Sequence, residues 1–253
     1  MRYFLHLAYQ GKNYRGWQRQ SNVISIQQVI EDSISKMLKE KVYIHGCGRT
    51  DSGVHATQYF AHIDISKDID FDFVRRINLI LPHDISIYEL IPVEEDFHAQ
   101  HDAKVRSYTY YMHIKKIPSK SDTSAYYKID KLDMDKIKPA IGILRETKDF
   151  RSLCKSPDIY KHTLCNIYQL DFIEQNENIS YRLEIKADRF LRGMIRYIVA
   201  RLIDIGTDKL SLEEFSSTLS SRSDFGCKFQ RPGYPQGLYL SKVEYPYLVR
   251  DIE

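Results

Sequence analysis

The feature that most constrains this chain is a glycine-rich stretch at residues 46–56, with the sequence GCGRTDSGVHA. Three of its first eight residues are glycine, and it lies between two apolar runs at residues 42–44 and 59–63. Glycine tolerates backbone angles that other residues avoid, so the pattern predicts a tight loop between two strands. Loops held by a rigid scaffold are common places for reactive side chains.

The loop carries an arginine and a carboxylate two residues apart, Arg49 and Asp51. A nearby cation favours the ionised form of a carboxylate, which suits Asp51 to nucleophilic or electrostatic work. A structural interpretation stays open beside this one. In it, Thr50 and Asp51 only bond to local backbone N–H groups and stabilise the turn.

Two other local interpretations are weaker. Ser52 and His55 form a nucleophile and base in the first, but the strand-G-x-S-x-G-helix context of such pairs is absent. The second is a metal site, which lacks C-x-x-C or H-x-x-x-H spacing and would use His45, Cys47, His55 and His62.

Residues 14–20 place cations beside an aromatic ring, with Arg15, Trp17 and Arg19 in seven positions. Such a loop suits phosphates and a base, and a structural tryptophan is an equal alternative. A strand expected from residue 104 has cations and rings on one face, either as a solvated edge or as a platform for nucleotides. The residues of that face are Lys104, Arg106, Tyr108 and Tyr110.

Residues 189–200 have the apolar spacing of an amphipathic helix. Arg189, Arg192 and Arg196 then recur at i, i+3 and i+7, on one helical face. A solvated basic stripe and a nucleic-acid contact are both consistent with this pattern.

Other elements follow from periodicity and capping. Ser25 with Gln28 predicts the start of a helix, and Ser211 with Glu214 forms a capping box for a helix that ends near Ser220. Alternation or apolar runs predict strands at residues 2–9, 58–65, 85–92 and 179–187, and helices are expected at residues 71–81 and from residue 133.

Composition limits the class of protein. The net charge of +3 and a pI near 8.5 permit a nucleic-acid partner without requiring one. No apolar run reaches membrane-spanning length, and no signal-peptide pattern opens the chain, so we expect a cytoplasmic protein without a membrane partner. Its four cysteines lie far apart, as expected of free thiols in a reducing compartment.

With these motifs the chain resembles the TruA family of tRNA pseudouridine synthases, and the resemblance extends from Tyr9 to Pro246. The family signature G-R-T-D-A-G-V-H matches residues 48–55, except that Ser52 replaces alanine. Further matches are G-W-Q-x-Q at residues 16–20, F-H-A-R-x-x-A-x-x-R-x-Y-x-Y at 97–110, D-F-x-S-F at 149–153, F-x-R-x-M-V-R at 190–196 and H-G-L-Y-L at 236–240.

The resemblance implies an α+β fold. Two ferredoxin-like halves, residues 1–98 and 99–253, would form one continuous, mainly antiparallel sheet with helices on one side and a central basic cleft. It also implies a homodimer that needs no cofactor and no metal.

The chemistry implied is the isomerisation of uridine to pseudouridine in the anticodon stem-loop of tRNA, at positions 38 to 40. Asp51 would be the nucleophile or base, Arg49 would occupy the space of the flipped base, and Arg196 would pair with Asp51. Tyr108 would pack against the uracil ring. RNA contacts would come from Arg15, Trp17, Arg19, Lys104, Arg106, Arg189 and Arg192.

The chain departs from the family pattern in several places. Gln10 replaces an aspartate, Gln100 an arginine, and Cys165 an arginine that we expect to face the nucleic acid; residues 225–231 also differ. A different tRNA or rRNA uridine is therefore an alternative target. A non-catalytic RNA-binding protein or RNA chaperone is the alternative of another class, although it would not need Asp51, Tyr108 and Arg196 together.

Overall fold

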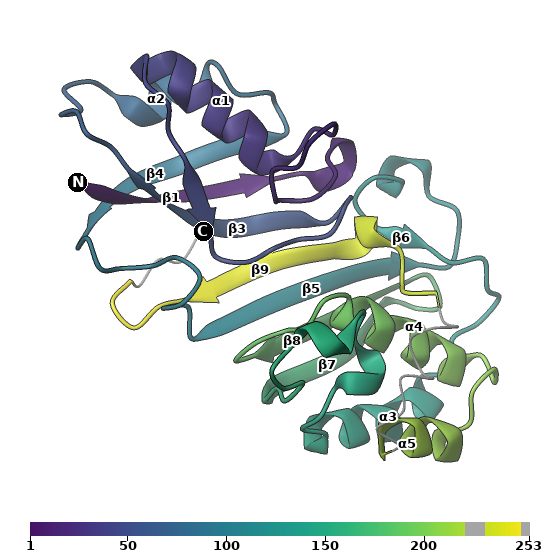
Figure 1. Ribbon diagram of the computed structural model, residues 1–253. Coiled ribbons are helices and arrows are strands. Elements are labelled where there is room, and N and C mark those ends of the chain that lie inside the picture. Colours follow the sequence, from purple (N-terminus) through teal and green to yellow (C-terminus); the bar gives the residue numbers. More distant parts are fainter. Residues whose placement is uncertain (221–230, 249–253) are drawn as a thin grey trace. The chain divides into compact units, whose positions relative to one another are not determined.

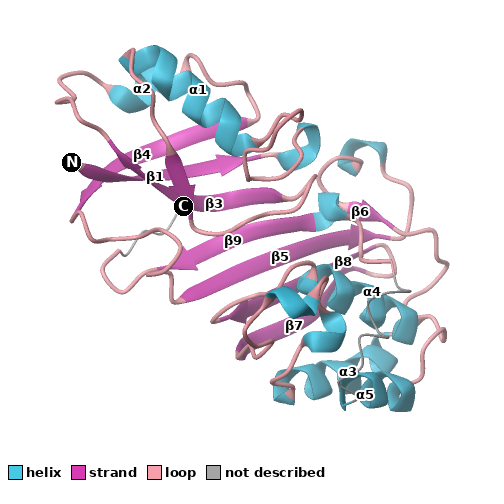
Figure 2. Ribbon diagram, in the orientation of Figure 1, coloured by secondary structure: helices cyan, strands magenta, loops and turns pink. Residues whose placement is uncertain are grey.

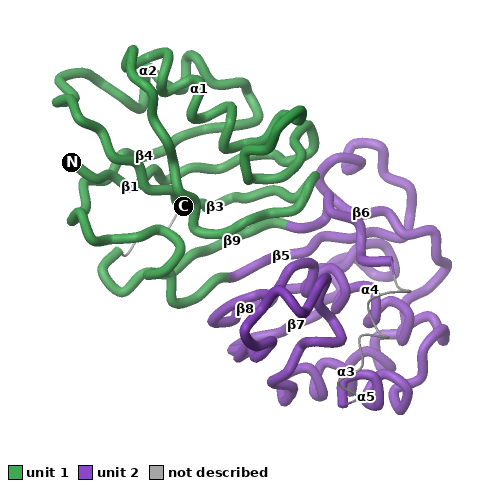
Figure 3. Tube along the Cα trace, viewed as in Figure 1, with its two compact units in different colours: residues 1–106, 239–253 green, residues 107–238 purple. Residues whose placement is uncertain are grey.

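The computed structural model describes residues 1–220 and 231–248, which form two compact units (Figure 3). Unit 1 comprises residues 1–106 and 239–253, and unit 2 comprises residues 107–238. The described strands are β1 Arg2–Tyr9, β2 Ile44–Gly46, β3 His55–Asp64, β4 Ile85–Val93, β5 Val105–His113, β6 Ala125–Tyr126, β7 Ile167–Asn176, β8 Ser180–Ala187 and β9 Leu238–Glu244. The α-helices are α1 Ile26–Leu38, α2 Phe73–Asn78, α3 Met134–Glu146, α4 Met194–Gly206 and α5 Leu212–Ser220 (Figure 2).

Unit 1 contains a mostly antiparallel sheet in the order β4-β1-β3-β9, with β2 beside β3 (Figure 1). β1 pairs antiparallel with β3 and β4, and β2 pairs antiparallel with β3. β9 joins β3 in parallel, with His55 opposite Tyr239. β9, the last described strand, thus belongs almost entirely to unit 1.

Helix α1 shows why its sequence folds as predicted. The Ser25 hydroxyl accepts a hydrogen bond from the Gln28 N–H at 3.3 Å, which caps the first turn. Its apolar side chains Ile26, Ile30 and Ile34 are all fully buried. This helix lies beside α2 in unit 1 (Figure 1).

Unit 2 contains the strand order β5-β8-β7, in which β7 and β8 are antiparallel, while the short β6 pairs in parallel with β5. Helices α3, α4 and α5 belong to the same unit (Figure 3). A side chain at Gly206, the last residue of α4, would lie 2.7 Å from Leu132, so glycine permits this close approach. The capping box is confirmed, because Ser211 and Glu214 each accept the other's backbone N–H at 3.1 Å. Antiparallel sheets with separate helices confirm the α+β class.

One predicted helix begins later than expected. α4 begins at Met194, after Gly193 with a φ of +74°, so residues 189–193 are not helical. The Arg192 N–H donates to the Tyr160 hydroxyl at 2.9 Å, and its carbonyl accepts from the Lys155 N–H at 2.8 Å. The prediction that Arg189, Arg192 and Arg196 share one helical face is therefore wrong, because tertiary hydrogen bonds hold this backbone in another conformation.

Within the described ranges, every helix is too short or too polar to cross a membrane. The unusual sequence at residues 225–231 lies almost wholly outside the described residues.

His62 of β3 is buried, and its ring packs against those of two other histidines. The ring centroids lie 4.8 Å apart for His62 and His45, and 4.6 Å apart for His62 and His98. Its Nδ1 accepts a hydrogen bond from the Ala99 N–H at 3.2 Å, which requires an unprotonated nitrogen. Burial, and next the neighbouring His98, lower the pKa of His62 to about 4.

We expect this histidine to make folding acid-sensitive. The unfolded chain binds a proton below the ordinary pKa of 6.5, whereas the folded chain resists protonation down to about pH 4. The stability that His62 provides is therefore complete above pH 6.5 and falls by about 2 to 3 kcal/mol as the pH approaches 4. His62→Asn keeps an acceptor for Ala99 and removes the titration, so its stability should fall less.

The measurement is urea unfolding of both proteins at pH 7.5 and pH 4.5. An equal loss of stability in the two proteins would show that His62 does not titrate in this way.

Candidate active site

The glycine-rich loop (residues 46–56) is anchored immediately before Asp51. The Thr50 carbonyl accepts a hydrogen bond from the Trp17 N–H at 3.2 Å, and its Oγ1 lies 2.9 Å from the hydroxyl of Tyr9. Both partners belong to residues 9–17, which we call the supporting segment. Asp51 itself is partly exposed. Thr50 is thus held by backbone and side chain alike, which fixes the chain on one side of the carboxylate.

The chain is anchored again immediately after Asp51. The Tyr14 carbonyl accepts hydrogen bonds from the Gly53 N–H at 3.3 Å and from the Ser52 hydroxyl at 3.2 Å. Ser52, which replaces the family's alanine, therefore adds a contact. The Tyr14 hydroxyl donates to Asp84 at 2.5 Å, and the Asn13 amide also bonds to this carboxylate. Asp51 is consequently flanked on both sides by residues bound to one rigid segment.

Two glycines allow the supporting segment to approach the loop. Gly16 has a φ of +87°, and a Cβ there would lie 2.4 Å from the Thr50 carbonyl oxygen. A Cβ on Gly11 would lie 1.9 Å from the carbonyl oxygen of Val54. No side chain fits at either contact, so these two positions require glycine.

Hydrogen bonds also hold the beginning of the loop. The Tyr59 hydroxyl donates to the Gly48 carbonyl, and Arg106 Nη2 donates to the carbonyls of Cys47 at 2.8 Å and Gln100 at 2.9 Å. Arg106 was expected to contact RNA. Its guanidinium holds the carbonyl of Cys47 within the loop and that of Gln100 outside it, which supports the loop's geometry.

Trp17 is 2% exposed and stacks on Tyr59 with ring centroids 4.0 Å apart. A Cβ on Gly46 would lie 2.6 Å from the indole nitrogen, so the loop packs directly on this ring. The burial favours the structural interpretation of Trp17 over contact with a base.

The weaker local interpretations find no support in the geometry. The Ser52 hydroxyl donates to Tyr14, while His55 Nδ1 accepts from the Gly11 N–H at 3.2 Å and its ring stacks on Tyr239. Serine and histidine are thus held by different partners. Over residues 1–220 and 231–248, the His, Cys, Asp and Glu side chains form no group of three or more that could bind a metal.

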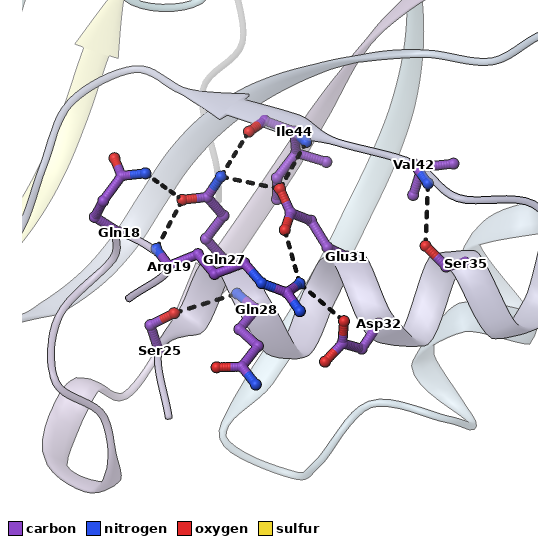
Figure 4. Close-up of polar contacts among 10 residues, drawn as sticks. All are labelled: Gln18, Arg19, Ser25, Gln27, Gln28, Glu31, Asp32, Ser35, Val42 and Ile44. Carbon is purple, nitrogen blue, oxygen red and sulfur yellow. Dashed lines mark hydrogen bonds and ion pairs between the residues drawn. The ribbon is translucent and has the colours of Figure 1, made fainter. Parts of the chain in front are cut away.

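Arg19, another expected RNA contact, is held by carboxylates of α1 (Figure 4). Its Nη1 donates to Glu31 at 3.0 Å and to Asp32 at 2.8 Å, and these partners raise the pKa of Arg19. The Arg19 N–H and the Gln18 amide both donate to Gln27 Oε1 at 2.9 Å.

The same network reaches the strand that leads into the glycine-rich loop (Figure 4). The Gln27 amide donates to the Ile44 carbonyl at 3.0 Å, and Glu31 accepts from the Ile44 N–H at 3.1 Å. Glu31 is only 2% exposed. Sequence reasoning missed both residues, although a carboxylate next to the apolar stripe of α1 was a signal for a buried polar contact.

Four expected cations are exposed and make no side-chain hydrogen bond or ion pair with the described residues. They are Arg15, Arg49, Lys104 and Arg192. Protein oxygens already bind the guanidinium groups of Arg19 and Arg106 and compete there with phosphate. These four cations have no such competing partner among the described residues.

Unit 2 contains the remaining expected site residues. Tyr108 is partly exposed and packs edge-on against Phe190, with ring centroids 5.0 Å apart. Arg189 lies 3.4 Å from the ring nitrogens of His162. Arg196 Nε donates to the Gly233 carbonyl at 2.7 Å. Arg49 and Asp51 therefore belong to unit 1, and Tyr108 and Arg196 to unit 2.

Cys165 does not lie at an exposed surface. Its side chain is 1% exposed, and burial raises the pKa of the thiol to about 12. Cys165 is thus part of the interior of unit 2, and the cation that the family has at this position is absent from this chain.

Comparison with known proteins gives consistent matches. Residues 144–246 match the sequence profile described as tRNA pseudouridine synthase. The chain is 40% identical to "tRNA pseudouridine synthase A" of Azobacteroides pseudotrichonymphae and 37% identical to that of Porphyromonas gingivalis, with 97% of each chain covered in both cases. It is 36% identical to "tRNA pseudouridine synthase A 1" of Protochlamydia amoebophila, with 96% of each chain covered.

Gly16→Ala should destabilise unit 1 by about 2 kcal/mol or more, because it combines a positive φ with a clash against Thr50. Gly142→Ala is the matched control. Gly142 lies in α3, where a Cβ would meet nothing within 4 Å, so alanine should stabilise by about 0.5 to 1 kcal/mol.

Thermal or urea unfolding of the two variants measures this difference. Equal stabilities would contradict the close contact between the supporting segment and the glycine-rich loop.

Proposed function

The chain belongs to the tRNA pseudouridine synthase family, isomerases that act on tRNA, and from that premise we propose that it converts uridine to pseudouridine at positions 38 to 40 of the anticodon stem-loop. Asp51 supplies the catalytic carboxylate. The observation that carries this assignment is the anchoring of Thr50 before Asp51 and of Ser52 and Gly53 after it.

This anchoring matters because catalysis depends on position. A carboxylate on a mobile loop would sample many orientations, whereas one between two fixed residues keeps a narrow range relative to the substrate. The loop gains its rigidity from backbone contacts and buried rings, so Asp51 is pre-organised before RNA binds.

The reaction rearranges one nucleotide. The N1–C1′ bond breaks, the uracil ring turns, a C1′–C5 bond forms, C5 loses its proton and N1 gains one. An ionised Asp51 serves as a nucleophile at C1′ or C6, or as the base that removes a proton. Both roles need a carboxylate close to a uridine that has left the base stack.

Three further residues support this step. Arg49 lies on the same loop, is exposed and occupies the space that the flipped uridine leaves. Tyr108 packs against the uracil ring and carries a proton in the final step. Arg196 pairs with Asp51 and keeps it ionised, since an adjacent cation favours the charged form.

The phosphate contacts come mainly from the exposed cations Arg15, Arg49, Lys104 and Arg192. Arg19, Arg106 and Arg189 already contact groups of the protein, so they contribute less to RNA affinity. Trp17 supports the loop from within unit 1.

The assembly completes the proposal. Two ferredoxin-like halves form a continuous sheet with a basic cleft, and the enzyme works as a cytoplasmic homodimer.

Asp51→Asn should abolish pseudouridine formation and leave RNA binding within about tenfold, because the amide is isosteric and lacks only the negative charge. Asp68→Asn is the control, because Asp68 is exposed and makes no side-chain hydrogen bond or ion pair with the described residues. Turnover and binding are measured on the same anticodon stem-loop. Turnover by Asp51→Asn above about a hundredth of the unmodified protein's rate would exclude the nucleophile assignment.

Arg192→Ala should weaken binding of all RNAs alike and lower the slope of log Kd against log salt by about one, because one phosphate contact is lost. Arg19→Ala should leave the slope nearly unchanged, since Glu31 and Asp32 already neutralise Arg19. Salt titrations of both variants give the slopes. If Arg19→Ala lowers the slope by as much as Arg192→Ala does, Arg19 exchanges its carboxylates for phosphate.

A further inference from the structure

Two tyrosines of unit 2 form a closed ring of hydrogen bonds with one residue of the segment before β9. The hydroxyls of Tyr110 and Tyr127 lie 2.7 Å apart. The Tyr110 hydroxyl donates to the Tyr234 carbonyl at 2.9 Å, and the Tyr234 N–H donates to the Tyr127 hydroxyl at 3.2 Å. The polar groups of the Tyr234 backbone are thus both bound by tyrosine side chains.

The hydrogen bonds of this ring can have only one arrangement of donors and acceptors. Each hydroxyl has a single proton, and the proton of Tyr110 goes to the Tyr234 carbonyl. Tyr127 must therefore donate to Tyr110, and it accepts from the Tyr234 N–H. Tyr110 is fully buried, which holds its pKa well above the ordinary value of 10 and keeps its proton in place. Every donor in the ring has an acceptor, so the arrangement is rigid.

The residue before Tyr234 connects this ring to Arg196. The Gly233 carbonyl accepts from Arg196 Nε at 2.7 Å, and the Gly233 N–H donates to the Arg196 carbonyl at 2.8 Å. A Cβ on Gly233 would lie 2.9 Å from the Tyr127 hydroxyl oxygen and 3.1 Å from that of Tyr110. Gly233 is therefore in contact with the ring of hydrogen bonds on one side and with Arg196 on the other.

A second contact fixes the same segment. A Cβ on Gly237 would lie 2.5 Å from the Tyr111 carbonyl and 3.0 Å from the Ala125 Cβ, so the backbone packs closely on β5 and β6. The position of the Gly233 carbonyl is thus determined by the ring of hydrogen bonds and by this packing. A bond from Nε to a fixed carbonyl sets the plane of a guanidinium, and its two terminal nitrogens are those that an end-on pair with a carboxylate uses.

We propose that Tyr127 is a positioning residue for Arg196, acting through the backbone of Gly233 and Tyr234. The inference rests on the proposed function, in which Arg196 pairs with Asp51. Tyr127 does not touch the substrate. It holds the carbonyl that orients the Arg196 guanidinium, so its loss changes the rate of the chemical step and leaves RNA binding intact.

The test is a double-mutant cycle of Tyr127→Phe and Arg196→Met, measured as single-turnover rates on an anticodon stem-loop at a temperature where all variants remain folded. Tyr127→Phe keeps the aromatic side chain and removes its hydroxyl, which opens the ring of hydrogen bonds. We therefore expect about a tenfold lower rate at saturating enzyme and an unchanged Kd for RNA. With Arg196→Met already present, Tyr127→Phe should lower the rate less than twofold further.

Tyr126→Phe is the matched control, because the neighbouring Tyr126 stacks on His113 and its hydroxyl makes no hydrogen bond with the described residues. Its rate should equal that of the unmodified protein.

Two outcomes overturn the inference while the proposed function stands. Either Tyr127→Phe leaves the rate unchanged, or it lowers the rate by the same factor in the presence and absence of Arg196. If Arg196→Met alone has no effect on the rate, the assigned role of Arg196 fails, and the inference fails with it. The single Arg196→Met variant distinguishes that case from the first two.

Discussion

The geometry around Asp51 depends on hydrogen bonds between the glycine-rich loop and the supporting segment. The Tyr14 carbonyl binds Ser52 and Gly53, and the Trp17 N–H binds the carbonyl of Thr50. These contacts require backbones to approach more closely than side chains allow, which is why glycine occupies positions 11 and 16. The partly exposed Asp51 thus lies on a loop that is bound to the supporting segment, and Asp84 in turn binds that segment. Unit 1 thus fixes the residue that we propose as the catalytic carboxylate and leaves it partly exposed.

Arginines of this protein lie in two different environments. Arg106 binds the backbone carbonyls of Cys47, in the loop, and of Gln100, and Arg19, which follows the supporting segment, is held to α1 by Glu31 and Asp32. Arg192 and Arg49 remain exposed, where a phosphate can compensate their charge. The distinction has a physical basis. An arginine that already satisfies carboxylates or carbonyls must lose those bonds before it binds RNA, whereas an exposed one exchanges only water and counterions.

Local patterns in the sequence predicted local structure well. Alternation gave β1 its bounds, and the caps at Ser25 and Ser211 were confirmed, because these signals depend on neighbouring residues alone. The start of α4 was not predictable from periodicity, because Arg192 bonds to Tyr160, which lies 32 residues earlier in the chain. Trp17 and Cys165 show the same limit. Whether such a side chain is buried depends on what packs against it, and the spacing of residues does not contain that information. The candidate site followed from the match of a whole motif, while its supports Gln27 and Glu31 became evident only from their contacts with Ile44.

We propose that this chain makes pseudouridine in the anticodon stem-loop through the anchored loop that carries Asp51. The most direct test maps pseudouridine, nucleotide by nucleotide, in tRNA from a strain that lacks the protein, before and after incubation with the purified protein. We expect new pseudouridine at positions 38 to 40 and at no other uridine. Modification confined to other positions, or none in any tRNA, would contradict it.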